Sequence, residues 1–92
     1  MKYEIKRTSQ FKKDYKLAVK RGFKINLLKE VVSLLANGQP LPEKNKDHAL
    51  TGNWKGYREC HIEPDWLLVY RISEDKLILS LTRTGTHSDF DF

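Results

Sequence analysis

A nearly uninterrupted apolar run lies in the second half of the chain: Trp66-Leu67-Leu68-Val69-Tyr70-Arg71-Ile72. A run this apolar is typical of a central strand that is covered on at least one face. The segments on either side, residues 57–62 and 77–82, show the two-residue alternation of strands. Pro64-Asp65 and the polar residues 73–76 supply the turns between them. Together the three segments predict an antiparallel meander.

The N-terminal segment predicts a short strand followed by a helix. Residues 2–6 alternate between polar and apolar side chains, and Thr8 or Ser9 can cap a helix that starts after them. Gly22 suits the C-terminal cap of that helix. Its apolar stripe, at helical spacing, consists of Phe11, Tyr15, Ala18 and Val19.

We expect a second helix to begin near Asn26 and to end at Asn37-Gly38. Its buried stripe consists of Leu28, Val31, Val32 and Leu35. The short link favours an antiparallel helical hairpin, and residues 39–46, with two prolines, predict an extended loop.

These elements predict one α+β domain over residues 1–92. It has an N-terminal strand, a two-helix hairpin packed on one face of a small, mostly antiparallel sheet, and a short C-terminal segment. The helices must lie on the sheet to bury their stripes. The opposite face of the sheet is left open, with room for a site.

Charge and composition narrow the class of protein. Lys and Arg outnumber Asp and Glu by 17 to 12, giving a net charge of +5. This excess points to a polyanionic partner, either a nucleic acid or an acidic protein, with simple solubility as the alternative. The single cysteine, Cys60, excludes a disulfide within a monomer and favours a reducing cytoplasm. Membrane association is not expected, because the longest purely apolar run is residues 66–70. A bilayer-spanning helix needs about 20 apolar residues.

All three histidines lie in the second half of the chain, in three different segments. His61 has the same strand parity as Glu59, whereas Cys60 and Ile62 have the parity of core residues. His61 is therefore expected on the uncovered face. Asp65 follows in the turn, where it is either an accessible carboxylate or an ordinary turn former.

Arg83 lies near the end of the last predicted strand. An arginine there can hold a phosphate with two parallel hydrogen bonds. Its parity, however, is that of Leu79 and Leu81, which should face the core. Arg83 must then project beyond the helices, or a bulge must redirect it. A surface ion pair is the alternative.

Trp66 has two readings of equal weight. It packs in the core, or it stacks on a nucleic-acid base, which is worth about 1–3 kcal/mol. For Trp54 packing is favoured. A metal site is disfavoured by the histidine spacing, since no HxH or HxxxH pair is present and Cys60 has the opposite strand parity to His61. No cofactor is expected.

Several stretches resemble the YafQ branch of the RelE-like toxins of bacterial type II toxin–antitoxin systems. The likeness runs almost end to end, and its most specific parts are Lys46–Leu50, Gly52–Glu59, His61–Tyr70 and Arg83–Ser88. It implies a RelE-like, microbial-RNase-like fold. Proteins of that family cleave mRNA in the ribosomal A site. They are silenced by a cognate acidic antitoxin, RelB-like or DinJ-like, through which alone they reach operator DNA.

The resemblance also implies a set of site residues. The family's active-site positions match His48, His61, Asp65, Arg83 and His87, and its neighbouring tryptophan, an RNA-binding position, matches Trp66. Relatives usually follow the last histidine with two residues and then Leu-Phe. This chain departs from that pattern, so the RNA-binding phenylalanine is Phe90 or Phe92.

We therefore expect a metal-independent endoribonuclease in which the ribose 2′-hydroxyl attacks the adjacent phosphorus. Histidine suits both the base and the acid of such a reaction, because its ordinary pKa lies near neutral pH. Asp65 would act as one of these groups or orient a histidine, and Arg83 would stabilise charge on the phosphate. Two other classes stay open: a catalytically inactive RNA- or ribosome-binding module, and an antitoxin-binding protein that acts in operon autoregulation.

Overall fold

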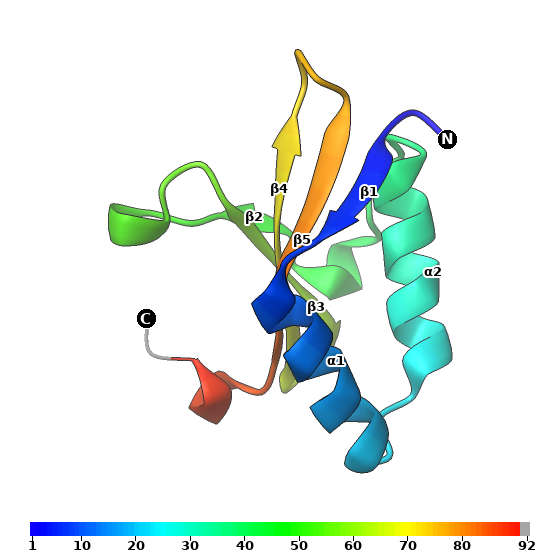
Figure 1. Ribbon diagram of the computed structural model, residues 1–92, viewed down its shortest axis with the longest axis vertical. Helices are drawn as coiled ribbons and strands as arrows, with labels where there is room; N and C mark the ends of the chain where they lie inside the picture. Colours follow the sequence, from blue (N-terminus) through cyan, green and yellow to red (C-terminus); the bar gives the residue numbers. More distant parts are fainter. Residues whose placement is uncertain (91–92) are drawn as a thin grey trace.

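The computed structural model describes residues 1–90, and a five-stranded sheet forms the centre of this part of the chain (Figure 1). The strand order is β1-β5-β4-β3-β2, with β1 parallel to β5 and every other pair antiparallel. The strands are β1 (Glu4–Arg7), β2 (His48–Ala49), β3 (Arg58–Glu63), β4 (Trp66–Ser73) and β5 (Ile78–Gly85). The predicted meander is β3-β4-β5, and the predicted α+β architecture is confirmed.

Two helices, α1 (Ser9–Lys20) and α2 (Ile25–Ala36), pack on one side of the sheet. Thr8 caps α1, because its Oγ1 accepts a hydrogen bond from the backbone N of Phe11 at 2.9 Å. Gly22, with φ of +77°, lets the chain turn after α1 at low steric cost. The helix limits agree with the predicted ones.

The core fills the space between the helices and the sheet. It takes Phe11 and Ala18 from α1, and from α2 it takes Leu28, Val31 and Leu35. The strands contribute Cys60, Ile62, Trp66, Leu68, Tyr70, Leu79 and Leu81.

Two expectations about buried residues are wrong. Val19 is 52% exposed, and Asp14 instead lies in the buried stripe of α1. Asp14 is three residues after Phe11 and four before Ala18, which is the spacing of one helix face. Leu77, expected in the last strand, sits in the preceding turn with φ of +53° and is 48% exposed.

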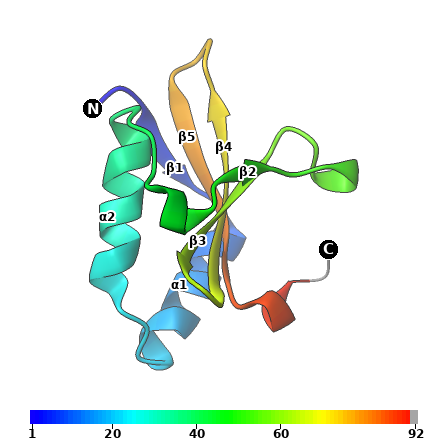
Figure 2. The same ribbon diagram turned by 180° about the vertical axis from the view of Figure 1, so that it is seen from behind.

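The sheet face opposite the helices is bordered by two short 3₁₀ helices. η2 (Gly52–Trp54) and η3 (His87–Asp89) lie on that side of the sheet in both views (Figures 1 and 2). We call this the open face. Leu67 and Val69 of β4 point to it, yet both are fully buried. No helix within residues 1–90 is long and apolar enough to cross a membrane.

Candidate active site

The three histidines form a row on the open face. The ring of His61, on β3, lies 5.7 Å from the ring of His87 and 6.5 Å from that of His48, measured between centroids. His48 is on β2 opposite Glu59, and His87 begins η3. Three distant segments therefore bring their imidazoles together.

Asp65 fixes His87. One carboxylate oxygen of Asp65 accepts from the backbone N of His87 at 3.0 Å and from its Nδ1 at 2.5 Å. The backbone bond, and then the side-chain bond, lower the pKa of the Asp65 carboxyl below its ordinary value. Asp65 thus stays ionised at neutral pH and directs Nε2 of His87 away from itself. Both side chains are more than half exposed.

His61 and His48 are also held through Nδ1. The Nδ1 of His61 lies 3.2 Å from the carbonyl oxygen of Pro64, and that of His48 lies 2.7 Å from the carbonyl of Lys46. A carbonyl can only accept, so Nδ1 carries the proton in both rings. His61 then presents Nε2, whereas Nε2 of His48 lies 3.4 Å from a carboxylate oxygen of Glu59.

A polar cluster, buried at Asn45 and Tyr70 and exposed at Asp47, supports the strands that carry these histidines. Asn45, 5% exposed, donates to the carbonyl oxygen of His61 at 2.7 Å. Asp47, just before His48, accepts from Arg58 at 3.0 Å and from the hydroxyl of Tyr70. Burial, and then the Asp47 contact, raise the pKa of Tyr70, so that its hydroxyl stays a donor.

Cys60, next to His61 in sequence, belongs to the core and not to this row. It is fully buried, and burial raises the pKa of its thiol to about 12. A thiol in this state is a poor nucleophile at neutral pH.

A β-bulge redirects Arg83, one of the two possibilities that its parity left open. Tyr70 faces Leu81 across the β4–β5 pair, whereas Val69 faces Arg83, so Thr82 is an extra residue on β5. The guanidinium reaches the edge of the sheet, with its Cζ 5.1 Å from the centroid of the Phe90 ring.

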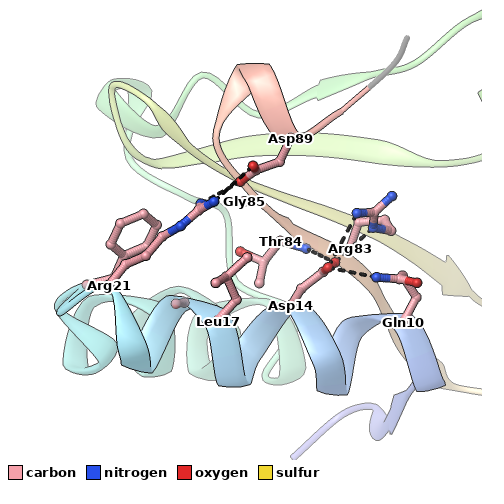
Figure 3. Close-up of a pocket in the computed structure, with 10 residues that line it drawn as sticks. Gln10, Asp14, Leu17, Arg21, Arg83, Thr84, Gly85 and Asp89 are labelled. Atoms are coloured by element: carbon pink, nitrogen blue, oxygen red, sulfur yellow. Dashed lines mark hydrogen bonds and ion pairs between the residues drawn. The ribbon is translucent and has the colours of Figure 1, made fainter.

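Arg83 pairs there with Asp14 of α1 (Figure 3). Its Nε donates to one carboxylate oxygen at 2.8 Å and its Nη2 to the other at 3.3 Å, which leaves Nη1 outside this ion pair. Asp14 also accepts from the backbone N of Thr84 and from the side chain of Gln10. Arg83 is thus ion-paired, and its partner is a buried carboxylate. The contacts of Arg83 are with Asp14 and Phe90, and it is not part of the histidine row.

The tryptophan and phenylalanine positions differ in their surroundings. Trp66 is 2% exposed, its indole N–H donates to the Thr84 hydroxyl at 2.9 Å, and its ring meets Phe23 edge-on. This packing supports the core reading of Trp66 and argues against stacking on a base. Phe90 lies half-buried beneath Arg83. Phe92 falls outside the described residues.

Sequence reasoning missed two acidic residues near the site. Asp14 anchors Arg83, and the signal for it was a charged residue at core spacing in an otherwise apolar stripe. Asp89, discussed below, binds Arg21. No group of three His, Cys, Asp or Glu side chains within residues 1–90 is placed to hold a metal ion.

Known proteins are similar to this chain along nearly its full length. Residues 3–91 match the family described as "Bacterial toxin of type II toxin-antitoxin system, YafQ". The mRNA interferase toxin YafQ of Escherichia coli K12 is 51% identical over 86 residues, which cover 92% of this chain and 91% of that protein.

Solved structures show the same fold. YafQ in the E. coli DinJ–YafQ toxin–antitoxin complex has a TM-score of 0.89 at 44% identity, with 100% of both chains covered. A metal-bound toxin from Helicobacter pylori has a TM-score of 0.91 at 47% identity, covering 97% of this chain and 99% of that one. From its sequence and its fold, this chain belongs to the YafQ family of toxins of bacterial type II toxin–antitoxin systems.

Proposed function

We propose that this toxin is an mRNA interferase: a ribosome-dependent endoribonuclease that cleaves translated mRNA by metal-independent acid–base catalysis. One observation carries the proposal. His61 and His87 lie 5.7 Å apart on an exposed face, each held by a hydrogen bond at Nδ1. Two imidazoles so placed can flank one phosphate, with one Nε2 on each side. The E. coli relative, an mRNA interferase toxin, supports the same activity.

The reaction needs a base for the 2′-hydroxyl and an acid for the leaving 5′-oxygen. The 2′-oxygen bonds to phosphorus as the bond to the 5′-oxygen breaks, which leaves a 2′,3′-cyclic phosphate and a 5′-hydroxyl. Asp65 places a negative charge beside His87, whereas the group on Nδ1 of His61 is a neutral carbonyl. We therefore assign His87 as the acid and His61 as the base. Each proton transfer is worth about 10²–10⁴ in rate.

We assign Arg83 the role of binding the reacting phosphate and stabilising its negative charge. Because Asp14 occupies Nε and Nη2, the guanidinium keeps a fixed orientation and offers Nη1 to a phosphate oxygen. We assign Phe90, which lies beneath the guanidinium, to contact with the RNA beside that phosphate. His48 extends the row on the far side of His61, and we assign it to the next stretch of the RNA backbone.

Exposure of the site supports dependence on the ribosome. The side chains of His87 and Asp65 are 59% and 68% exposed, so the toxin encloses little of its substrate. Holding the substrate in the reactive geometry accounts for a large share of catalysis. A site that encloses little of its substrate needs a second macromolecule to hold the RNA in place. A ribosome that holds mRNA in the A site supplies this positioning. We accordingly place the activity in the cytoplasm, where translation occurs.

The direct test is cleavage of an mRNA bound to programmed ribosomes, with mapping of the new ends. The wild-type protein should cut ribosome-bound mRNA and leave a 5′-hydroxyl, whereas free mRNA should be cut far more slowly. Binding without cleavage would support the inactive RNA- or ribosome-binding alternative. Equal cutting of free and bound mRNA would contradict ribosome dependence.

Metal independence needs its own test, since the H. pylori relative was solved in a metal-bound form. A chain that relies on histidine acid–base chemistry should cut at the same rate after exhaustive treatment with a chelator. The chelator is applied to the toxin alone and removed before mixing, so that the ribosomes keep their Mg²⁺. A loss of rate that Cu²⁺ or Zn²⁺ reverses would overturn this part of the proposal.

A groove on the helical side of the molecule supports an acidic antitoxin segment as partner. It has a volume of about 700 Å³ and lies between β1, α1 and α2. Its floor is apolar and includes Phe11, Tyr15, Leu28 and Val32. Four basic residues line it, namely Arg7, Lys12, Lys16 and Lys29. An amphipathic helix with acidic flanks complements this combination.

Binding of the cognate antitoxin can test this groove. Reversing two of its charges, with Lys12→Glu and Lys16→Glu together, should weaken the complex at least about tenfold and reduce its salt dependence. The matched control reverses Lys44 and Lys76, which are exposed outside the groove. Equal affinities for the two double variants would place the antitoxin elsewhere. Operator DNA should be bound by the toxin only together with the antitoxin.

A further inference from the structure

An ion pair connects the end of α1 to the C-terminal segment, 68 residues further along the chain. Arg21 follows the last residue of α1, and Asp89 is the last residue of η3. Nη1 of Arg21 donates to one carboxylate oxygen of Asp89 at 2.7 Å and Nη2 to the other at 3.2 Å. The pair spans one end of a cavity of about 230 Å³ (Figure 3).

Asp89 also caps its own 3₁₀ helix, η3. Its carboxylate accepts from the backbone N of Thr86 at 2.9 Å, as half of a capping box. The Arg21 contact, followed by the Thr86 contact, lowers the pKa of Asp89, so the carboxylate remains charged near neutral pH. Gly85 makes room for it, because a Cβ at that position would lie 2.8 Å from the same carboxylate oxygen.

These contacts matter because apolar packing does not hold η3. None of its residues is buried. The segment is fixed by Asp65 on one side, through His87, and by Arg21 on the other, through Asp89. His87 and Asp89 are only two residues apart, so a shift of Asp89 moves the imidazole relative to His61.

We propose that Arg21 and Asp89, with the space left by Gly85, are positioning residues that hold His87 for proton transfer. The proposal rests on the proposed function. Neither charge needs to touch the RNA. An error of about 1 Å in the place of a reacting group can cost about 10²-fold in rate, so a surface ion pair can matter for chemistry while adding little to stability.

The test is single-turnover cleavage of ribosome-bound mRNA over a range of toxin concentrations. Arg21→Ala should lower the maximal rate about tenfold or more with an unchanged half-saturating concentration. Arg21→Lys, which keeps the charge, should recover part of the rate. The control Lys6→Ala removes the exposed Lys6–Glu4 ion pair and should leave the rate unchanged. Thermal midpoints of all variants should agree within about 5 °C.

A double variant separates positioning from any other role. If Arg21 acts through His87, then Arg21→Ala should add no further loss to His87→Ala. Losses that multiply, a change confined to the half-saturating concentration, or a wild-type rate in Arg21→Ala would each overturn the proposal.

A failure of the proposed function gives a different result. If the wild-type protein does not cleave, the proposed enzymatic function fails, but the effect of the Arg21–Asp89 ion pair on His87 can still be measured by NMR. The Nδ1 proton of His87, bonded to Asp65, should be protected from exchange in the wild type and exposed in Arg21→Ala. Equal protection in both proteins would overturn the positioning role of the Arg21–Asp89 ion pair independently of activity.

Discussion

The carboxylate of Asp65 accepts two hydrogen bonds from a single residue, the backbone N and the ring Nδ1 of His87. Both bonds go to the same oxygen, and together they set the place of η3 and the orientation of the imidazole. Of the two roles considered for Asp65, the contact supports the orienting one, because the oxygen that His87 engages twice holds the ring in place.

Asp65→Asn should preserve the orientation of His87 and remove the charge beside it. An amide oxygen can still accept from Nδ1, so we expect cleavage to fall about tenfold, and about 10²-fold or more in Asp65→Ala. Cleavage rates of the two variants on ribosome-bound mRNA give the comparison. Asp75→Asn, in the exposed turn before β5, is the control. Equal rates in Asp65→Asn and Asp65→Ala would show that orientation contributes nothing.

The pH dependence of this contact has a defined sign. The pKa of Asp65 is lowered on folding, so the contact stabilises the native state above the unfolded carboxyl pKa of about 4. That contribution is lost as pH falls through the lower native value. The order of η3, read from the His87 amide, should therefore be retained at pH 5 and lost first in acid.

The assignment of acid and base can be tested with sulfur in place of the leaving 5′-oxygen. A thiolate leaves without prior protonation, so the loss caused by His87→Ala should shrink at least about tenfold with the sulfur substrate. The loss caused by His61→Ala should not change. Relief in His61→Ala instead would exchange the two roles. Relief in neither variant would argue against a histidine acid.

Asp14 should contribute more to stability than an ordinary surface carboxylate. It is 9% exposed and satisfies Gln10, Arg83 and the backbone N of Thr84. Asp14→Ala leaves those donors unpaired, so the free energy of unfolding should fall by about 2 kcal/mol, less than a fully buried pair because Arg83 is partly exposed. Denaturant unfolding measures this.

Glu4→Ala is the matched control for Asp14, since it removes an ion pair in which both side chains are more than half exposed. Its effect should stay below about 0.5 kcal/mol. Similar values for the two variants would mean that the Asp14 network adds nothing beyond a surface charge pair.

The fold was predictable because its signals are local and periodic. Alternation in residues 57–62, the apolar run after Pro64, and the glycine stop signals all concern neighbouring residues. The position of β1 beside β5 had no such signal, because a parallel pairing depends on how the helical hairpin returns the chain to the sheet.

The site was harder to predict where tertiary contacts override a local pattern. Arg83 has core parity, and only an extra residue at Thr82 turns it to the edge of the sheet. Trp66 begins a strand next to the polar Asp65, yet the Thr84 hydroxyl satisfies its indole inside the core. Neither Thr82 nor Thr84 carries a mark in the sequence that reveals these roles.

His87 offers the clearest separation of chemistry from stability. Its side chain is 59% exposed, and η3 buries none of its residues. His87→Ala should therefore change the free energy of unfolding by less than about 1 kcal/mol. If its Nε2 delivers a proton to the leaving oxygen, the same change should lower cleavage by about 10²-fold or more. Thermal unfolding and cleavage measured on one preparation decide between these effects. A histidine with only a structural role would give the reverse pattern, in which activity falls in step with the folded fraction, and a folded variant that cuts at the wild-type rate would remove His87 from the mechanism.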